Sequence, residues 1–354
     1  MRHMNRKSAL VVAAILLMGS IVQAQPPGHW VQNAPAGRGY FARVEALWLK
    51  RDASDAATLA TLNSTSSPGR VRVLATEDVD FDFETGIRAI AGMSLDACTQ
   101  IEAEYFGIDD FDGNQATLVR PAGPFALNSV YTLLNQTPLA YRADGETELH
   151  SGEINLRRTG GACRWTNSVL VGLRYMHIRD SLQLDTFGFP PIANAPLAFE
   201  STSTETRNNL FGIQLGGDVG YHWDFFHLTA AAEGFLYANF YESDAQNVIS
   251  DPSGFFLVPA GGGTFRNSTD EDNKATAGIG AQINVDAALN LTENIILHAG
   301  YNFLAISDVA LGSEQMPEVR PSPLRGARIS NPDRSKELGS LFFHGPSAGI
   351  EIRW

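Results

Sequence analysis

Paired acidic residues are the feature of this chain whose types and spacing could do chemistry. Glu102 and Glu104 lie two positions apart and would share one face of a β-strand. Two carboxylates placed in this way can work as general acid and general base in hydrolysis. Arg88, on a preceding segment, offers a simpler interpretation, because an arginine on a neighbouring strand would form structural ion pairs with them.

His177 and Asp180 form a second candidate, a pair of the kind that a surface hydrolase needs near its rim. Solvent-exposed histidines explain the same pattern more simply, and no histidines have the His-Glu-x-x-His spacing of a zinc site. Residues 261–263 are glycines without the lysine and hydroxyl residue of a phosphate-binding loop, and there is no nucleophile elbow. The sequence therefore predicts no enzyme activity, no metal centre and no cofactor.

Charge and composition limit the classes of partner. The 354 residues include 26 basic and 39 acidic side chains, which give a formal net charge of −13. This excludes a nucleic-acid-binding protein that works by neutralising phosphates, because such proteins cluster lysine and arginine. An apolar content of 44% excludes a disordered chain.

Residues 1–24 are interpreted as a signal peptide. Three basic residues precede an apolar run that is shorter than the ~20 residues of a membrane-spanning helix and that ends in small residues. Its removal would leave 330 residues with a net charge of −16. Residues 25–38 contain three prolines and no periodicity, so they are expected to form a flexible periplasmic leader.

Alternation of apolar and polar residues with a period of two dominates the chain from Gly39 onward. In residues 274–290 every odd position is apolar and nearly every even position is polar or glycine. A helix would spread both sets around its circumference, so the pattern predicts two-faced β-strands. Ten such segments span residues 40–50, 81–93, 98–107, 146–158, 163–177, 207–221, 225–241, 274–290, 294–306 and 341–354.

The connections between these segments predict the architecture. Long connections of 29–38 residues alternate strictly with short ones of 3–4 residues. Outer-membrane barrels have short periplasmic turns, long external loops and an even number of strands. We therefore expect residues 39–354 to form a single all-β domain, a closed antiparallel transmembrane β-barrel of about ten strands. A secreted soluble β-sandwich is the alternative.

Two further expectations concern the rim of this barrel. Several segments are longer than the ~9–11 residues that cross a bilayer, so they should project outward as hairpins. Residues 70–77, within the first long connection, could supply an additional strand and raise the count to twelve.

The end of the chain resembles an assembly signal. Ile350, Ile352 and Trp354 alternate with polar residues up to the last position. A final strand of this kind is similar to the C-terminal sorting signal of outer-membrane proteins. We therefore expect an outer-membrane location, membrane lipid around the wall, and the barrel-assembly machinery as a partner during biogenesis.

Charged residues on the inward faces of the predicted strands are the candidates for a transport path. Charges cannot stay unpaired in a dry interior, so they must face water or pair with one another. Two interpretations stay open: a lumen packed with salt bridges, and a narrow water-filled path that favours cations because its lining is net acidic. The candidates are Arg43, Glu45, Asp82, Glu84, Arg88, Glu102, Glu104, Glu153, Arg157, Arg174, Asp218, Glu233, Asp286, Glu351 and Arg353.

The two cysteines are candidates for a disulfide. Cys98 and Cys163 each follow a short turn, so both should lie at the periplasmic end of neighbouring hairpins. An oxidising compartment permits a bridge between them. The intervening strand could also hold their Cα atoms beyond the ~7 Å that a disulfide tolerates, so both states stay open.

The long connections carry most of the acidity. They hold 12 basic and 24 acidic side chains, a net charge of −12. Loose binding of divalent cations, for example at Asp270, Glu271 and Asp272, is one expectation. In the last connection the arginines at 320, 325 and 328 could contact lipopolysaccharide, or that connection could fold back over the mouth of the barrel.

The strand motifs also resemble those of a known family, the putative beta-barrel porins of type seven described from planctomycete bacteria. The resemblance implies an outer-membrane barrel and a porin label, and this chain departs from the family pattern at Ala310-Leu311-Gly312, where arginine-proline-glycine is expected. We therefore expect a porin or narrow channel for small, preferentially cationic solutes, with a non-conducting surface protein anchored by its barrel as the alternative. The motifs are YFARVEALWLK (40–50), GIRAIAGMSLDACTQIEAEYFG (86–107), EINLRR (153–158), CRW (163–165), LVGLRYM (170–176), TRNNLFGIQLGG (206–217), NIILHAGYNFLAIS (294–307) and the end of the chain from Gly349 to Trp354.

Overall fold

The computed structural model describes most of the chain from residue 39 onward. The predicted signal peptide (1–24) and leader (25–38) lie outside the described residues. The described residues are 39–52, 58–64, 70–75, 78–119, 125–128, 139–162, 164–188, 198–251, 263–316, 318–322, 326–330 and 338–354.

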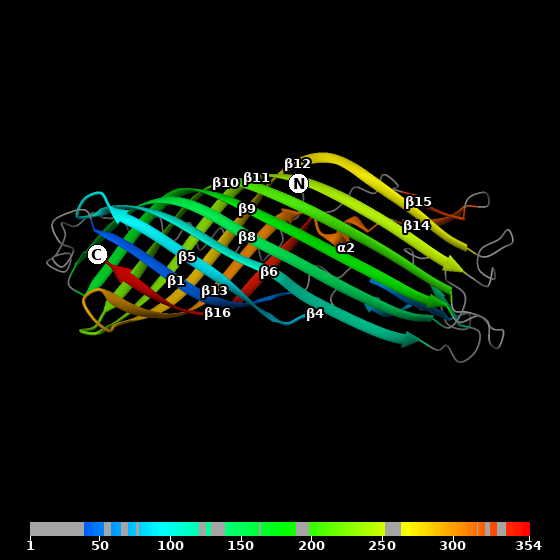
Figure 1. The fold of residues 1–354 in the computed structure, drawn as a ribbon, viewed down its shortest axis with the longest axis horizontal. Helices are drawn as coiled ribbons and strands as arrows, with labels where there is room; N and C mark the ends of the chain where they lie inside the picture. The colour runs from blue at the N-terminus through cyan, green and yellow to red at the C-terminus, as the bar shows by residue number, and fades with distance from the viewer. Residues whose placement is uncertain are drawn as a thin grey trace.

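Ten long antiparallel strands form a closed barrel in which the strands run obliquely around a long axis (Figure 1). Each strand pairs with its neighbour along the chain, and pairing of the first with the last closes the cylinder. The predicted fold class and the count of ten wall strands are confirmed. The wall strands are β1 (Tyr40–Arg51), β5 (Phe83–Ser94), β6 (Thr99–Val119), β8 (Leu139–Ala162), β9 (Trp165–Gly188), β10 (Ala198–His222), β11 (Phe226–Asp251), β12 (Gly263–Asn290), β13 (Ile295–Val309) and β16 (Gly339–Arg353).

Tight turns join the strands at one end of the barrel, where the C-terminus also lies (Figure 1). The turn between β5 and β6 shows how the sequence makes one. The Asp96 carboxylate accepts hydrogen bonds from the backbone N–H groups of Cys98 and Thr99, both at 2.8 Å. Such a side-chain turn reverses the chain within four residues, as the short connection predicted.

The strands at the opposite end are longer than predicted. β8 to β12 contain 24 to 28 residues each, whereas the longest predicted segment had 17. Much of residues 108–145, 178–206 and 242–273, interpreted as loops, belongs to paired strands. The projecting rim is therefore present, but the predicted strand ends are wrong, because the alternation continues there with its two faces exchanged.

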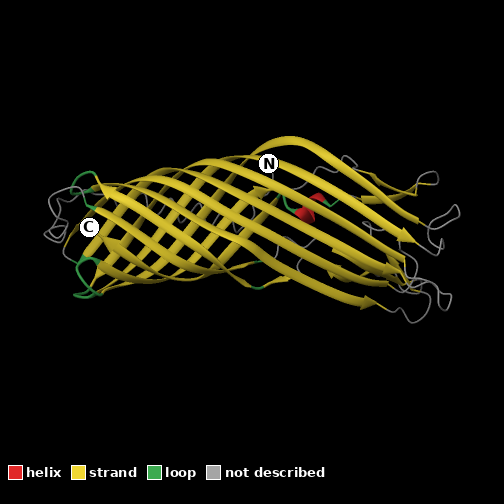
Figure 2. Cartoon of the chain, in the orientation of Figure 1, coloured by secondary structure: helices red, strands yellow, loops and turns green. Residues whose placement is uncertain are grey.

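Shorter elements lie between the long strands. The expected strand at residues 70–77 exists as β3 (Arg70–Ala75), but it belongs to a separate small sheet, so the alternative count of twelve wall strands is wrong. That sheet also contains β2 (Thr58–Ser64) and β7 (Phe125–Asn128), β4 (Asp80–Phe81) pairs with β6, β14 (Glu318–Ser322) pairs with β15 (Gly326–Ser330), and the short helix α2 (Gly312–Gln315) is drawn red in Figure 2. No helix among the described residues is long and apolar enough to cross a membrane.

An apolar belt surrounds the half of the barrel nearest the tight turns. On β9, Val171 and Leu173 are 54% and 64% exposed, whereas the next residue, Arg174, points inward and is buried. Aliphatic side chains on an outer face and charged ones on the inner face are the arrangement of a wall that faces lipid. We call this half the belt.

The faces are exchanged in the other half, which we call the extension. It comprises β6 and β8 to β12 beyond the belt. On β9, Arg179 and Gln183 face outward there, whereas Ile178, Leu182 and Leu184 are buried inside the barrel. An apolar interior beneath a polar outer face is typical of a structure in water.

Candidate functional site: the barrel interior

Charged side chains fill the interior of the belt. They come from every wall strand, because each strand of the barrel turns alternate residues inward. We call this set the charged layer. It consists of Arg43, Glu45, Arg88, Glu102, Glu104, Glu153, Arg157, Arg174, Asp218, Glu233, Asp286, His298 and Glu351.

The first cluster of the charged layer centres on Arg88. Its guanidinium lies 3.0 Å from Glu45 Oε2 and 3.0 Å from Glu104 Oε1, and it donates to Asn302 Oδ1 at 2.9 Å. Glu45 also accepts a hydrogen bond from Arg43 Nε at 2.6 Å. The predicted pairing of Arg88 with Glu104 is thus confirmed. An ion pair therefore explains the position of Glu104 without a catalytic role for Glu102 and Glu104.

The second cluster centres on Arg174, which is only 3% exposed. Arg174 Nη2 donates to Glu153 and to Gln282 Oε1, and it lies 3.5 Å from Glu233 Oε2. Its guanidinium carbon also lies 4.6 Å from the centre of the Phe235 ring. The arginine therefore joins the charged layer below to apolar side chains above, by ion pairs on one side and a cation–π contact on the other.

Two more clusters complete the layer. Arg157 donates to Glu102 Oε1 at 2.9 Å and also binds Asp218. At the mouth by the tight turns, His298 Nδ1 lies 2.8 Å from Asp286 and His298 Nε2 lies 3.3 Å from Glu351. All four clusters lie within the belt, where pairing offsets the cost of removing charges from water.

Three predicted lining residues lie elsewhere. Asp82 is exposed in the break between β4 and β5, because Phe81 is buried and Phe83 is 51% exposed, so the inward–outward phase changes there. Its assignment to the lumen is wrong. Arg353 has a side chain 55% exposed at the mouth, where it donates to Glu351. Glu84 faces inward above the charged layer, opposite Leu49.

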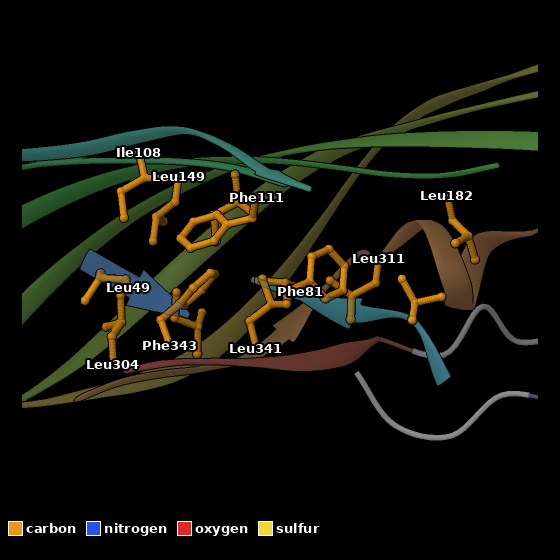
Figure 3. Packing of buried hydrophobic residues seen from close by; sticks show 14 of the residues in the cluster. Leu49, Phe81, Ile108, Phe111, Leu149, Leu182, Leu304, Leu311, Leu341 and Phe343 are labelled. Carbon is orange, nitrogen blue, oxygen red and sulfur yellow. The ribbon is translucent and has the colours of Figure 1, made fainter. Parts of the chain in front are cut away.

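Apolar side chains fill the interior above the charged layer. We call this set the apolar layer. Figure 3 shows the packing, with side chains from opposite walls pointing toward one another, and the Phe111 and Phe343 rings lie 5.2 Å apart. Contributions come from most of the wall strands, among them Leu49, Ile108, Leu149, Leu304 and Leu341.

Two stretches between wall strands enter the apolar layer, and we call them the plug. They are residues 78–81, which carry Val79 and Phe81, and residues 309–316, which carry Leu311 and α2. Val79 is 2% exposed and Leu311 is fully buried. The first residues of the last long connection, with the Ala310-Leu311-Gly312 departure, therefore lie inside the barrel, and the expectation that the arginine-bearing part folds over the mouth stays a prediction.

The chain matches one protein family over almost all of its described length. A family model described as Putative beta barrel porin-7 matches residues 41–354. The chain belongs to this family. The resemblance carried by the strand motifs is thereby confirmed, and the chain forms a porin-like barrel of the outer membrane. The tight turns then mark the periplasmic end, and the extension is external.

Curated proteins and solved structures add less. No curated protein matches this chain. Similar solved barrels include the outer membrane protease OmpT from Escherichia coli (12% identity, 91% of this chain and 100% of that chain, TM-score 0.46) and the toluene transporter TodX from P. putida (7% identity, 90% of each chain, TM-score 0.26). A Pseudomonas aeruginosa FadL homologue is 8% identical over 90% of each chain, with a TM-score of 0.23. Similarity this low carries nothing about activity.

The candidate hydrolase pair is separated in the barrel. His177 faces outward on β9, where its Nδ1 lies 3.0 Å from Asn209 Oδ1. Asp180 faces inward, is 2% exposed and pairs with Arg51. The two side chains therefore lie on opposite faces of the wall and cannot act together on one substrate.

The expected lack of a metal centre and the Cys98–Cys163 bridge both stay predictions. Within the described ranges, no group of three or more His, Cys, Asp or Glu side chains is placed to hold a metal ion. Cys98 forms no disulfide with another described residue, and Cys163 lies outside the described residues, so the proposed bridge stays a prediction.

Arg51 and Asp180 form a buried ion pair inside the barrel that sequence reasoning missed. Arg51 Nη1 lies 2.6 Å from Asp180 Oδ1, and both side chains are nearly inaccessible to solvent. Asp180 was considered only with His177, because the strand was expected to end at residue 177. Continued alternation through Ile178, Asp180 and Leu182 would have placed it inside.

Proposed function

We propose that this barrel is a narrow channel of the outer membrane that favours small cations. The observation that carries the proposal is the surplus of acid in the charged layer, where eight carboxylates face four arginines and one histidine. A buried surplus of negative charge must be balanced by protons, by cations or by water. Rings of carboxylates inside a pore attract cations and repel anions.

Buried polar atoms without a protein partner support access of water to this layer. Within the described part of the chain, Gln214 Oε1 and Arg174 Nη1 are buried and make no hydrogen bond to protein. Buried polar groups of this kind are commonly satisfied by ordered water. A polar layer that takes up water can pass small hydrated or partly dehydrated ions between its side chains.

The second candidate is a non-conducting surface protein that uses its barrel as an anchor. The apolar layer favours it, since that layer closes the external half of the lumen with side chains such as Phe111 and Phe343. In this case the charged layer is purely structural, and the extension is the functional part.

Planar-bilayer recording of the refolded protein tests the two candidates. If the barrel is a channel, we expect conductance steps. In a KCl gradient the reversal potential should shift toward the equilibrium potential of potassium and away from that of chloride. The double variant Glu104→Gln/Glu233→Gln should reduce this cation preference, whereas Glu205→Gln on the outer surface should leave it unchanged. Absence of steps from a barrel whose folding is confirmed by heat-modifiable gel mobility would reject the channel and favour the anchor.

Export and assembly complete the proposal. Cleavage of residues 1–24 would give a mature protein that begins at Gln25, which N-terminal sequencing of the membrane-inserted form checks. Ile350, Ile352 and Trp354 face outward with exposures of 42%, 47% and 60%, so the final strand can present them to the barrel-assembly machinery. We propose no enzymatic role.

We propose lipopolysaccharide and divalent cations as external partners of the barrel. Treatment with EDTA, which removes divalent cations, should alter the heat stability of the protein if they bind.

A further inference from the structure

Hydrogen bonds to their backbone hold residues 309–316 of the plug against the inner wall, beside the apolar packing of Leu311. Asp308 has φ +55°, which turns the chain inward at the end of β13. The Asn208 side chain binds both backbone groups of Ala310. Its Oδ1 accepts a hydrogen bond from the Ala310 N–H and its Nδ2 donates to the Ala310 carbonyl, each at 2.8 Å. Thr206 Oγ1 donates to the same carbonyl at 2.9 Å, and Asn239 donates to the Asp308 carbonyl at 3.3 Å.

One buried ion pair fastens both parts of the plug. Asp180 Oδ2 accepts the Gly312 N–H at 2.8 Å, while its Oδ1 binds Arg51 at 2.6 Å and Thr147 at 2.7 Å. The Arg51 guanidinium carbon lies 4.4 Å from the centre of the Phe81 ring. Asp180 thus holds the later stretch through Gly312, and Arg51 holds the earlier one through Phe81.

The wall does not depend on these contacts. Asp180 and Thr206 pair within the continuous β9–β10 ladder, and Arg51 ends the ladder between β1 and β16. Residues 310–338 connect two strands that are already paired along Ile295–Ile306. Residues 310–316 can therefore leave the wall, exchanging their hydrogen bonds for water and withdrawing Leu311 from the apolar layer, without opening the strand pairs along Ile295–Ile306.

We propose that the plug is a gate that closes the channel at the apolar layer, and that the Arg51–Asp180 pair is its latch. The inference rests on the proposed channel. The apolar layer excludes water and ions as a hydrophobic constriction, whereas the charged layer beneath it selects the ions. A buried ion pair contributes little net stability but fixes one arrangement, which suits a latch that must also release.

Gly312 offers a way to disturb the gate without touching a strand. A Cβ at this position would lie 2.8 Å from Leu182 N and 3.2 Å from Thr204 O, which are backbone atoms of the wall. Gly312→Ala should therefore displace this part of the plug from the inner wall of the barrel. Gly152→Ala is the matched control, because a Cβ there meets nothing within 4 Å.

A second variant should hold the gate shut. A Cβ at Gly339 would lie 3.0 Å from Leu311 Cγ, so cysteines at both positions come within the ~3.5–4.5 Å between Cβ atoms that a disulfide needs. The pair Leu311→Cys/Gly339→Cys, with Cys98→Ser and Cys163→Ser to remove other thiols, links the plug to β16 under oxidation and frees it under reduction.

The test combines conductance with labelling of Leu311→Cys by a membrane-impermeant maleimide, both in the same serine background. Displacing the plug with Gly312→Ala should raise the labelling rate and the open probability about tenfold, since overpacking destabilises the closed arrangement relative to the open one. Oxidation of the cysteine pair should abolish opening, and reduction should restore it. Gly152→Ala should match the parent protein.

The outcomes separate the gate from the channel. Faster labelling in Gly312→Ala without conductance in any variant would reject the channel and, with it, a gate for ions. Conductance in the parent protein that neither Gly312→Ala nor the oxidised cysteine pair alters would overturn the gate and leave the channel standing. An unchanged labelling rate in Gly312→Ala would also overturn the gate.

Discussion

The belt and the extension are built from the same strands with opposite polarity. On β11, Leu236 and Phe240 face outward in the belt with exposures of 59% and 50%, whereas Ile249 faces inward in the extension and is fully buried. The backbone register runs through the change: β10 and β11 pair without interruption from Phe199–Ser250 to His222–His227. The surrounding medium, lipid or water, therefore determines which face of the strand is apolar. The hydrogen-bonded pairing of the strands is unchanged between the two halves.

Tyrosine and histidine mark the level at which polarity changes. Tyr105 Oη lies 3.0 Å from His150 Nδ1 on the neighbouring strand, and Tyr301 Oη lies 2.8 Å from His344 Nδ1. Such side chains have an apolar body and a polar tip, which suits the boundary between hydrocarbon and headgroups. The two halves thus meet at a defined ring, and the gate lies on the external side of it.

The largest expected effect comes from removing a side chain of the apolar layer. Phe343→Ala removes a fully buried ring that packs against Phe111, and we expect a loss of ~3–5 kcal/mol in the free energy of unfolding. Phe211→Ala is the matched change on the lipid face, where Phe211 is 55% exposed. Its loss should be clearly smaller, since lipid chains can fill the space. Urea titration followed by gel mobility measures both, and equal losses would contradict a stabilising core in the apolar layer.

A charge on the outer face should separate lipid from water. Leu173→Arg places a guanidinium in the belt, and we expect a cost of ~2–4 kcal/mol in the same titration. Gln183→Arg makes the same addition ten residues further along β9, on the outer face of the extension, and should be close to neutral. If both variants behave alike, the boundary of the belt is misplaced.

The fold was largely predictable because alternation and loop lengths carry it. The ten strands and their order followed from period-two patterns and from the contrast between long and short connections. The strand ends did not, because the apolar positions on β9 shift from odd residues such as Leu173 to even ones such as Ile178. That shift was interpreted as the end of a strand, although it marks the passage from lipid to water along one strand.

The interior was predictable residue by residue only where the alternation held. Glu45, Arg88, Glu153 and Arg174 lie in the charged layer as expected, since each shares the inward phase of its strand. The plug was not predictable, because its position depends on contacts between Asp180 on β9, Arg51 on β1 and the backbone of Gly312, which are far apart in sequence. No periodicity records such contacts.

The smallest expected effect concerns the outer surface of the extension. Arg179 binds Glu205 at 2.9 Å and Glu148 at 2.8 Å, and its hydrogen bond to Glu205 lowers the pKa of that carboxyl. Glu205→Gln should cost only ~0.2–1 kcal/mol at neutral pH, because the pair is partly exposed and screened. A carboxyl whose pKa is lowered in the folded state stabilises above its unfolded pKa, and this contribution is lost as pH falls through the folded value. The stability difference between Glu205→Gln and the parent should therefore shrink on acidification below about pH 4. A difference that grows in acid would show that the ionised pair does not stabilise the extension.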